Sequence, residues 1–262
     1  MKIIKSLIKC NFEPRTNRKI EYIVIHYTAG LSSEKGSALG CAKNTFGNPA
    51  TGASAHYIVD DFDIVQAVED KDKAWHCGTK KGYKHKYCRN ENSIGIEISS
   101  NYKGGIPKGK TYKDLNSADS NWYLTDSAKE LAAQLTAELC VKYNLHPNEA
   151  VLRHYDITGK DCPSPFVDDN KEGFLGWLKF KTMVLRYYND ILNIDNESDN
   201  IEKVGDKVVY HKLDNVPEWA KSIVKWYLDE GYMSGKGDDI LDISEDMLRM
   251  MVILYRVITD KE

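Results

Sequence analysis

Three residues of metal-binding type stand where a folded chain could bring them together: His26, His154 and Cys162. Each histidine lies near the end of an apolar, strand-like run, and Cys162 follows the second run in a loop that contains prolines. Two imidazoles and one thiolate suit zinc, and three protein ligands leave a fourth position open for chemistry. The chain holds seven histidines and six cysteines, so ordinary buried side chains are the alternative.

Short runs of β-branched and aromatic residues predict the strands that carry these groups. Residues 22–28 (YIVIHYT) form a buried strand that delivers His26 near its C-terminal end, which is where α/β folds place chemistry. Residues 151–155 form a second strand that carries His154. Residues 93–99 (SIGIEIS) alternate in polarity, so Glu97 faces away from three isoleucines.

The other segments complete an α/β pattern. A helix over residues 125–144 is indicated by leucines at i, i+4 spacing and by a capping-box-like start at Ser127 and Glu130. Periodicity predicts further elements at residues 36–46 (a helix), 56–59 and 64–68 (a hairpin) and 174–188 (a closing helix).

Composition divides the chain into two domains. Residues 189–200 are rich in Asn, Asp, Glu and Ser and are predicted to be a linker. The linker separates residues 1–188, which hold the candidate chemistry, from residues 201–262, which are expected to form a small, mainly helical domain. In that domain one helix is predicted over residues 217–230, with Trp219, Ile223, Trp226 and Tyr227 on one face, and a second from Ser244.

Charge and hydropathy exclude several functions. The net charge of -3 and the pI near 6.2 give no basic footprint for nucleic acid. No uncharged apolar run approaches the roughly 20 residues that span a bilayer, so membrane insertion is not expected. The basic N-terminus lacks an apolar signal-peptide core, and synthesis in the cytoplasm is therefore expected.

Five blocks occur in order along the chain: IVIHYTAG (23–30), SAHYIVDD (54–61), AWHCG (74–78), NSIGIEIS (92–99) and RHYDITGKDCP (153–163). Over roughly residues 20–165 the chain thereby resembles the type 2 N-acetylmuramoyl-L-alanine amidases, a family that includes bacteriophage endolysins and peptidoglycan recognition proteins. The resemblance implies a central mixed β-sheet flanked by helices. It also implies zinc-dependent hydrolysis of the amide bond between N-acetylmuramic acid and L-alanine in peptidoglycan.

The resemblance assigns roles to individual residues. It makes His26, His154 and Cys162 the zinc ligands, with a water in the fourth position whose pKa zinc lowers. It makes Glu97 the general base and acid and Lys160 the group that stabilises the developing oxyanion. Three further side chains from the matched blocks are predicted to contact substrate: His56, Trp75 and His76.

One departure from the family bears on the mechanism. Some phage members carry a tyrosine before the histidine of the second block, and here that position is Ala55. A tyrosine-assisted mechanism is therefore not expected, and the proton-transfer role falls to Glu97.

The C-terminal region resembles one S-layer homology motif, through Trp219-Ala220, Gly231 to Gly235 and Leu254 to Arg256. The stretch that opens the second helix reads Ser244-Glu245-Asp246-Met247 and lacks the arginine of that family. The resemblance implies binding of secondary cell-wall polysaccharide, with Trp219, Trp226 and Tyr232 as candidate contacts. The alternative is a small helical domain that dimerises or caps the enzyme.

Two other classes compete with the amidase interpretation. A non-catalytic peptidoglycan-binding protein is disfavoured because Cys162, Glu97 and Lys160 are all present. A structural zinc protein that acts on nucleic acid is disfavoured because structural sites normally have four protein ligands. A wall-cutting enzyme made without a signal peptide suggests a phage or prophage endolysin that reaches the wall after release, and a host spore or recycling amidase is the alternative.

Overall fold

The computed structural model forms two compact units, Met1–Asn196 and Glu197–Glu262, and each is described by itself. The structure describes residues 2–192 except 16, 31, 107, 110–113, 117, 118 and 168–170, and in the second unit residues 209–233, 241, 243, 244, 247, 248, 250–252, 254 and 255. Residues 193–200 of the predicted linker lie outside this range, as do Ser234, Gly235, Glu245, Asp246 and Arg256 of the C-terminal motif. Within the described residues, no helix has the length and apolar character that a bilayer span requires.

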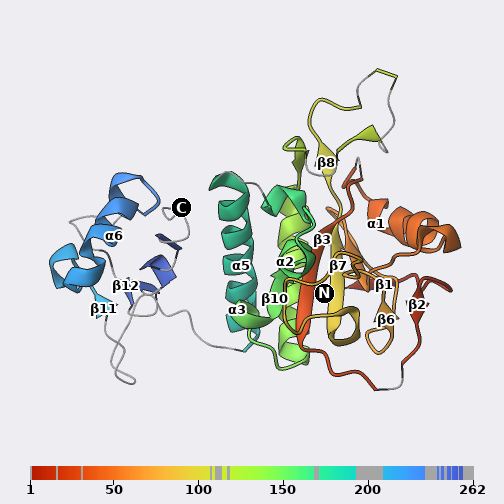
Figure 1. Ribbon diagram of the computed structural model, residues 1–262, viewed down its shortest axis with the longest axis horizontal. Helices are drawn as coiled ribbons and strands as arrows, with labels where there is room; N and C mark the ends of the chain where they lie inside the picture. The colour runs from red at the N-terminus through yellow and green to blue at the C-terminus, as the bar shows by residue number, and fades with distance from the viewer. Residues whose placement is uncertain are drawn as a thin grey trace. The chain divides into compact units, whose positions relative to one another are not determined.

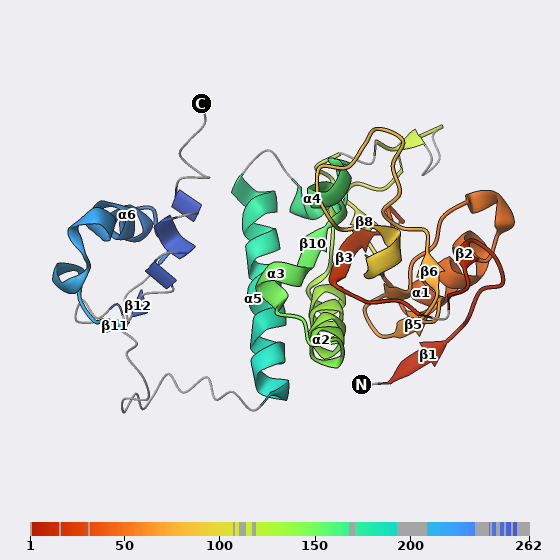
Figure 2. The ribbon, with the colours of Figure 1, turned by 60° about the horizontal axis from the view of Figure 1, so that its bottom comes forward.

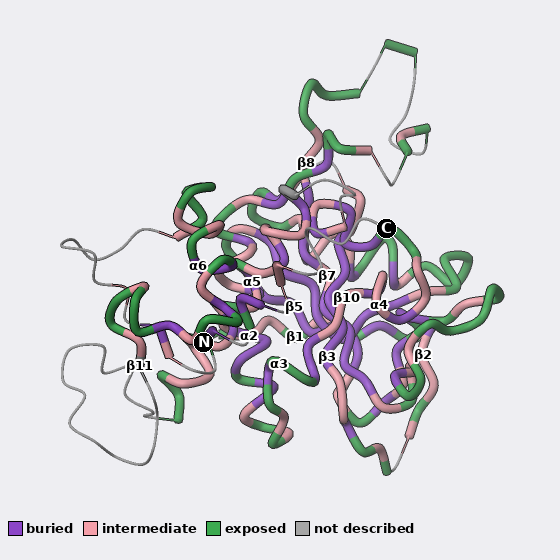
Figure 3. Tube along the Cα trace, turned by 60° about the vertical axis from the view of Figure 1, so that its left-hand side comes forward, coloured by how far each residue is buried: buried purple, intermediate pink, exposed green. Residues whose placement is uncertain are grey.

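A six-stranded sheet forms the centre of the first unit. Its strands follow the order β1 (Ile3–Lys5), β5 (Ile64–Gln66), β4 (Tyr57–Val59), β7 (Ser93–Ile98), β3 (Tyr22–Tyr27) and β10 (Val151–Arg153). Neighbouring strands run parallel except in the β4–β5 hairpin, so the sheet is mixed. The predicted fold class is thereby confirmed. Figure 3 shows that buried residues concentrate along the central strands.

Successive side chains along the strands point to opposite faces of the sheet, and a hydrophobic core lies on each face. Ile25 and Ile96 belong to the larger core, which α2 (Asp126–Lys142) and α5 (Lys171–Ile191) complete. Ile58 and Val65 belong to a smaller core on the opposite face, with α1 (Ser37–Gly40). Figure 1 and Figure 2 show α2 and α5 side by side on one face of the sheet.

The long helices differ from their predicted bounds at the ends. Thr125 is the N-cap of α2 and its side chain accepts a hydrogen bond from the Ala128 backbone, so the predicted capping box at Ser127 is wrong. Helix α5 continues to Ile191, so the first residues of the predicted linker are helical. Fully buried Phe180 anchors α5 against the larger core.

Short elements complete the first unit. The predicted helix 36–46 is split into α1 and a π-helical turn, Cys41–Phe46. The remaining elements are β2 (Phe12–Glu13) paired with β6 (Lys73–Ala74), β8 (Asn101–Tyr102) paired with β9 (Trp122–Tyr123), α3 (Pro147–Ala150), α4 (His154–Thr158) and 3₁₀ turns at Pro49–Thr51, Asn90–Asn92 and Ser164–Phe166.

The second unit contains α6 (Glu218–Asp229), a 3₁₀ turn at Leu213–Asn215 and a small antiparallel pair of β11 (Val209–Tyr210) and β12 (Ile243–Ser244). The buried face of α6 is centred on Ala220, Ile223 and Val224, whereas Trp219 is 53% exposed. Ile223 and Tyr227 of the predicted apolar face pack in this core, as predicted. Trp219 does not, because small Ala220 packs inward in its place. Ser244 belongs to β12, and its hydroxyl accepts from the backbone of Met247, where helical structure begins among the described residues.

Candidate active site

Two parallel strands bring His26 and Glu97 together. His26 on β3 lies directly opposite Glu97 on β7, so both side chains leave the same face of the sheet. Both are the next-to-last residues of their strands. This is the carboxyl edge of parallel strands, where α/β proteins bind ligands.

His154 reaches the same edge from the next strand. The sequence predicted that the strand extends to residue 155, but β10 ends at Arg153 and His154 is the first residue of α4. The strand ends because the Asp156 carboxylate accepts a hydrogen bond from the Arg153 backbone N–H at 2.8 Å. The same carboxylate forms an ion pair with the Arg153 guanidinium at 2.7 Å. The change from strand to helix α4 at His154 places its imidazole beside that of His26, with ring centroids 4.8 Å apart.

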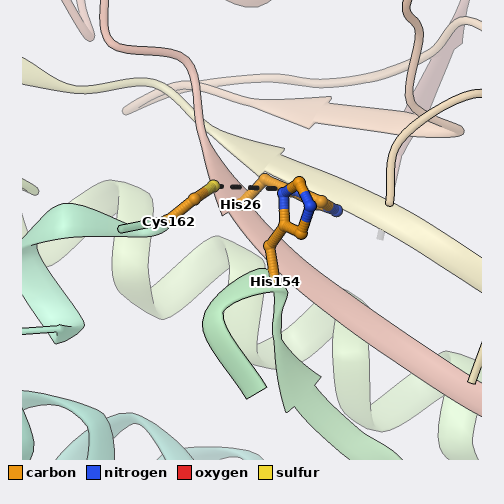
Figure 4. A group of neighbouring side chains, drawn as sticks. All are labelled: His26, His154 and Cys162. Atoms are coloured by element: carbon orange, nitrogen blue, oxygen red, sulfur yellow. Dashed lines mark hydrogen bonds between the residues drawn. The ribbon is translucent and has the colours of Figure 1, made fainter. Parts of the chain in front are cut away.

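Cys162 completes the set from the loop after α4. Its Sγ lies 3.6 Å from Nδ1 of His26, and the ligand atoms of the three residues all lie within 4.8 Å of one another. Figure 4 shows the three side chains converging from β3, the start of α4 and the following loop. All three residues are buried.

The donor set fits zinc. Two ligands of a tetrahedral zinc ion, one nitrogen and one sulfur, are about 3.6 Å apart. Both imidazole nitrogens of His154 are buried and have no hydrogen-bond partner among the described residues. Buried polar atoms without partners are rare unless a ligand or ion satisfies them, so this site has unmet capacity to bind a metal.

Burial keeps the three candidate ligands neutral in the metal-free protein. It holds the pKa of His26 well below its ordinary value and lowers that of His154 to about 3, which leaves the imidazoles uncharged and able to donate a lone pair. Burial also raises the pKa of the Cys162 thiol to about 12. A cation bound at this site would reverse that effect, because metal binding stabilises the thiolate.

Glu97 and Lys160 flank the set of candidate ligands. Oε2 of Glu97 is buried and has no hydrogen-bond partner among the described residues, and burial raises the pKa of the carboxyl to about 8. Lys160 is exposed and lines the same pocket as Glu97, and its positive charge acts in the opposite direction on that pKa. The site thus holds a buried carboxyl group whose pKa is raised toward neutrality and a cationic side chain on the same pocket.

One pocket of about 190 Å³ is lined by all five of these residues. Trp75, which is 38% exposed, and His76 also line it, so two of the three residues predicted to contact substrate reach the pocket. His56 does not line it. Its ring is fully buried, and its Nδ1 accepts a hydrogen bond from the Gly95 backbone at 2.9 Å.

The comparison with known proteins agrees with this geometry. A family model described as N-acetylmuramoyl-L-alanine amidase matches residues 16–165, more than half of the chain. The chain belongs to this amidase family. The match includes every residue of the site described above.

Individual relatives match the first unit of this amidase-family chain. The N-acetylmuramoyl-L-alanine amidase CwlL of Bacillus licheniformis is 28% identical over 183 residues, which cover 66% of this chain and 44% of CwlL. The catalytic domain of XlyA has a similar structure, with a TM-score of 0.51, 26% identity and coverage of 70% of this chain and 99% of that domain. A mutant endolysin from Bacillus subtilis gives a TM-score of 0.50 at 26% identity, with coverage of 70% and 98%. The chain spans about half the length of the amidases from Bacillus that it matches.

The sequence did not reveal how the residues directly behind this candidate site are arranged. His76 lies between His26 and Ser93, with His76 Nδ1 3.1 Å from His26 Nε2 and His76 Nε2 3.2 Å from the Ser93 hydroxyl. The His76 ring also covers Gly95 of β7, where an added Cβ would lie 2.6 Å from Cγ of that ring. Ser93 and Gly95 belong to the NSIGIEIS block, so the block was the available signal.

Gly95→Ala is expected to lower the free energy of unfolding by about 1–3 kcal/mol, the usual cost of forcing extra volume into a packed interior. The new methyl group would have to displace the buried His76 ring. Urea denaturation monitored by circular dichroism measures the change. Gly40→Ala is the matched control, because a Cβ there meets nothing within 4 Å. Equal midpoints for the Gly95→Ala variant and the wild type would show that the ring moves away without cost.

Proposed function

We propose that this protein hydrolyses the amide bond between N-acetylmuramic acid and L-alanine in bacterial peptidoglycan, with a zinc ion held by His26, His154 and Cys162. The observation that carries the proposal is the convergence of three buried zinc-type ligands, a carboxyl group of raised pKa and a lysine on one pocket. Membership of the amidase family supports the choice of substrate. Structural zinc sites are normally closed by four protein ligands, and three ligands leave the position that catalysis needs.

A bound zinc ion would supply Lewis-acid activation of the attacking water and of the scissile carbonyl. Glu97 accepts the proton that the water loses and returns it to the alanine nitrogen as the amide bond breaks. Burial alone raises the pKa of this carboxyl to about 8, and a nearby bound cation would lower that pKa again, so the group can exchange a proton near neutral pH. The ammonium group of Lys160 stabilises the negative charge that develops on the carbonyl oxygen.

Digestion of purified cell walls tests the proposed bond specificity. Cleavage by this protein is expected to release stem peptides with a new N-terminal alanine and to leave the glycan strands intact. Mass spectrometry of the soluble products, together with end-group labelling, identifies both features. New reducing sugar ends would instead indicate a glycosidase, and walls that bind the protein but release no product would indicate a non-catalytic binding protein.

We also propose that the enzyme acts as a phage or prophage endolysin, which reaches the wall after synthesis in the cytoplasm. The support is the similarity of its first unit to a Bacillus subtilis endolysin structure. A host spore or recycling amidase is the competing role. Lysis of cells on addition from outside, compared with selective cleavage of spore cortex or of free muropeptides, distinguishes these roles.

For residues 201–262 we propose binding to a secondary cell-wall polysaccharide. The support is a group of aromatic side chains around α6. Trp226 packs against Tyr232 and Tyr255, with ring centroids 5.3 Å and 5.1 Å apart, and Trp219 is exposed nearby on the same helix. Partly exposed aromatic rings present apolar area together with a polar group, which suits contact with carbohydrate.

Deleting residues 201–262 is expected to leave cleavage of soluble muropeptides largely intact and to weaken sedimentation with intact walls. The physical reason is that a wall anchor raises the local concentration of the enzyme at its substrate without entering the chemistry. Trp219→Ala in the full chain is expected to weaken sedimentation in the same direction. Unchanged sedimentation of both variants would reject the wall-binding role and favour a domain that dimerises or caps the enzyme.

A further inference from the structure

A series of hydrogen-bonded, buried side chains begins at Nε2 of His26, whereas Cys162 lies at Nδ1 of the same ring. His26 Nε2 lies 3.1 Å from His76 Nδ1, and His76 Nε2 lies 3.2 Å from the Ser93 hydroxyl oxygen. The Ser93 hydroxyl in turn lies 2.6 Å from the carbonyl oxygen of Arg89. Ser93 is fully buried and His76 is 8% exposed, so water does not compete freely for these contacts.

The direction of each hydrogen bond follows from its last member. A carbonyl oxygen can only accept, so Ser93 donates its single hydroxyl hydrogen to Arg89. The Ser93 oxygen must then accept from Nε2–H of His76. The sulfur of Cys77 lies 4.0 Å from the same oxygen, too far to displace the 2.6 Å hydrogen bond from Ser93 to Arg89.

The constraint continues to the candidate metal ligand. A neutral His76 that carries its proton on Nε2 has a bare Nδ1, which accepts from Nε2–H of His26. His26 then has no hydrogen on Nδ1, the nitrogen that lies 3.6 Å from Cys162 Sγ. In the metal-free protein the Cys162 thiol can donate to this bare nitrogen. Each hydrogen bond from Cys162 through His26, His76 and Ser93 to Arg89 then has one donor and one acceptor.

We infer that His76, held by Ser93, is a positioning residue that fixes the tautomer and the ring orientation of His26, so that Nδ1 of His26 is the nitrogen presented to the metal. This inference rests on the proposed zinc site. It gives His76 a role different from the predicted contact with substrate, because both of its ring nitrogens are already engaged within the protein.

The arrangement matters because a neutral imidazole has two tautomers and only one of them presents a lone pair at the metal position. Partners that orient a metal-bound histidine typically contribute 10- to 100-fold in metal affinity or activity. Gly95 also contributes to the positioning of His26, because any side chain at that position would occupy the space of the His76 ring. The sequence blocks AWHCG and NSIGIEIS therefore supply one structural unit, the support of the first ligand.

Nitrogen-15 NMR of the full-length, metal-free protein tests the tautomer directly. The wild type is expected to show His26 protonated on Nε2 and His76 protonated on Nε2. Ser93→Ala removes the acceptor with little change in volume, and a mixture of His26 tautomers is expected. A wild type in which His26 carries its proton on Nδ1, or a Ser93→Ala variant in which His26 keeps one tautomer, would overturn the inference.

Competition with a chromophoric chelator measures the consequence for zinc. His76→Phe retains a planar ring without nitrogens and is expected to raise the zinc dissociation constant on the order of 10- to 100-fold, and Ser93→Ala is expected to raise it by a smaller factor. Ser99→Ala is the matched control, since Ser99 is a buried serine whose hydroxyl has no hydrogen-bond partner among the described residues, and wild-type affinity is expected. Wild-type affinity in Ser93→Ala and in a folded His76→Phe variant would reject the positioning role.

The two measurements separate failure of this inference from failure of the proposed function. If the wild type binds no zinc, the proposed function fails, while the NMR experiment still decides whether Ser93 and His76 set the tautomer of His26. If the wild type binds zinc tightly and both variants do the same, the proposed function stands and the positioning role fails. If His76→Phe does not fold, as judged by circular dichroism, Ser93→Ala alone carries the test.

Discussion

His154→Ala is expected to reduce bound zinc to well below one ion per chain and to abolish hydrolysis of muropeptides. The variant leaves only His26 and Cys162 as ligands, and two protein ligands hold zinc poorly. The cost to folding is that of the cavity left by a buried ring, because both nitrogens of His154 lack hydrogen-bond partners among the described residues and removing them leaves no donor or acceptor unsatisfied. Elemental analysis after dialysis and a product assay by mass spectrometry measure the two effects.

His146→Ala is the control for removal of a histidine. His146 is exposed, caps the short helix α3 and does not line the site pocket, so full zinc content and normal turnover are expected. Full zinc occupancy in His154→Ala would exclude His154 as a ligand. Lost activity with full zinc would instead give that ring a role in binding substrate.

Two residues of the site, His26 and Glu97, could be placed from the sequence because side chains alternate along their strands. Alternation along β7 separates Glu97 from the isoleucines, and the same alternation along β3 separates His26 from Ile25. Parallel pairing then brings the two polar residues opposite each other. The family resemblance added the roles of these residues, which alternation cannot give.

The predictions were wrong at the ends of two elements. The strand pattern of residues 151–155 continues past Arg153, but a carboxylate at Asp156 captures the Arg153 backbone and starts α4 at His154. Polar composition suggested that the linker begins at residue 189, but α5 continues to Ile191. Local composition indicates which element forms, but it does not fix the last one or two residues of that element.

The support behind the ligands was also beyond sequence reasoning. Ser93 lies on β7 and His76 lies in the segment after β6, and only the folded sheet brings both to His26. Small Gly95 gave no chemical signal, although its missing Cβ is what admits the His76 ring. The role of His76, Ser93 and Gly95 as one support therefore appears only once the distances are known.

Glu97→Gln is expected to retain zinc and to lower turnover by about 10²-fold or more, the range usual for loss of an acid–base group. Glutamine keeps the size of the side chain but can neither accept nor return the proton in the proposed mechanism. Zinc content, turnover on soluble muropeptides and the pH dependence of unfolding are measured on the same preparation. Glu34→Gln, at an exposed position, is the control and should match the wild type in all three.

The stability of the metal-free Glu97→Gln variant supplies an independent check. Burial raises the pKa of Glu97 from 4.5 to about 8, so between these values the unfolded chain ionises while the folded protein keeps its proton. Wild-type stability therefore falls as pH rises through this window, by at most about 1.4 kcal/mol per pH unit from this group. The glutamine variant lacks this loss and should become more stable relative to the wild type toward pH 8. Near-normal turnover with zinc bound would show that Glu97 is only a strand residue and would move proton transfer to another group, whereas loss of zinc would mean that the carboxylate supports the metal site itself.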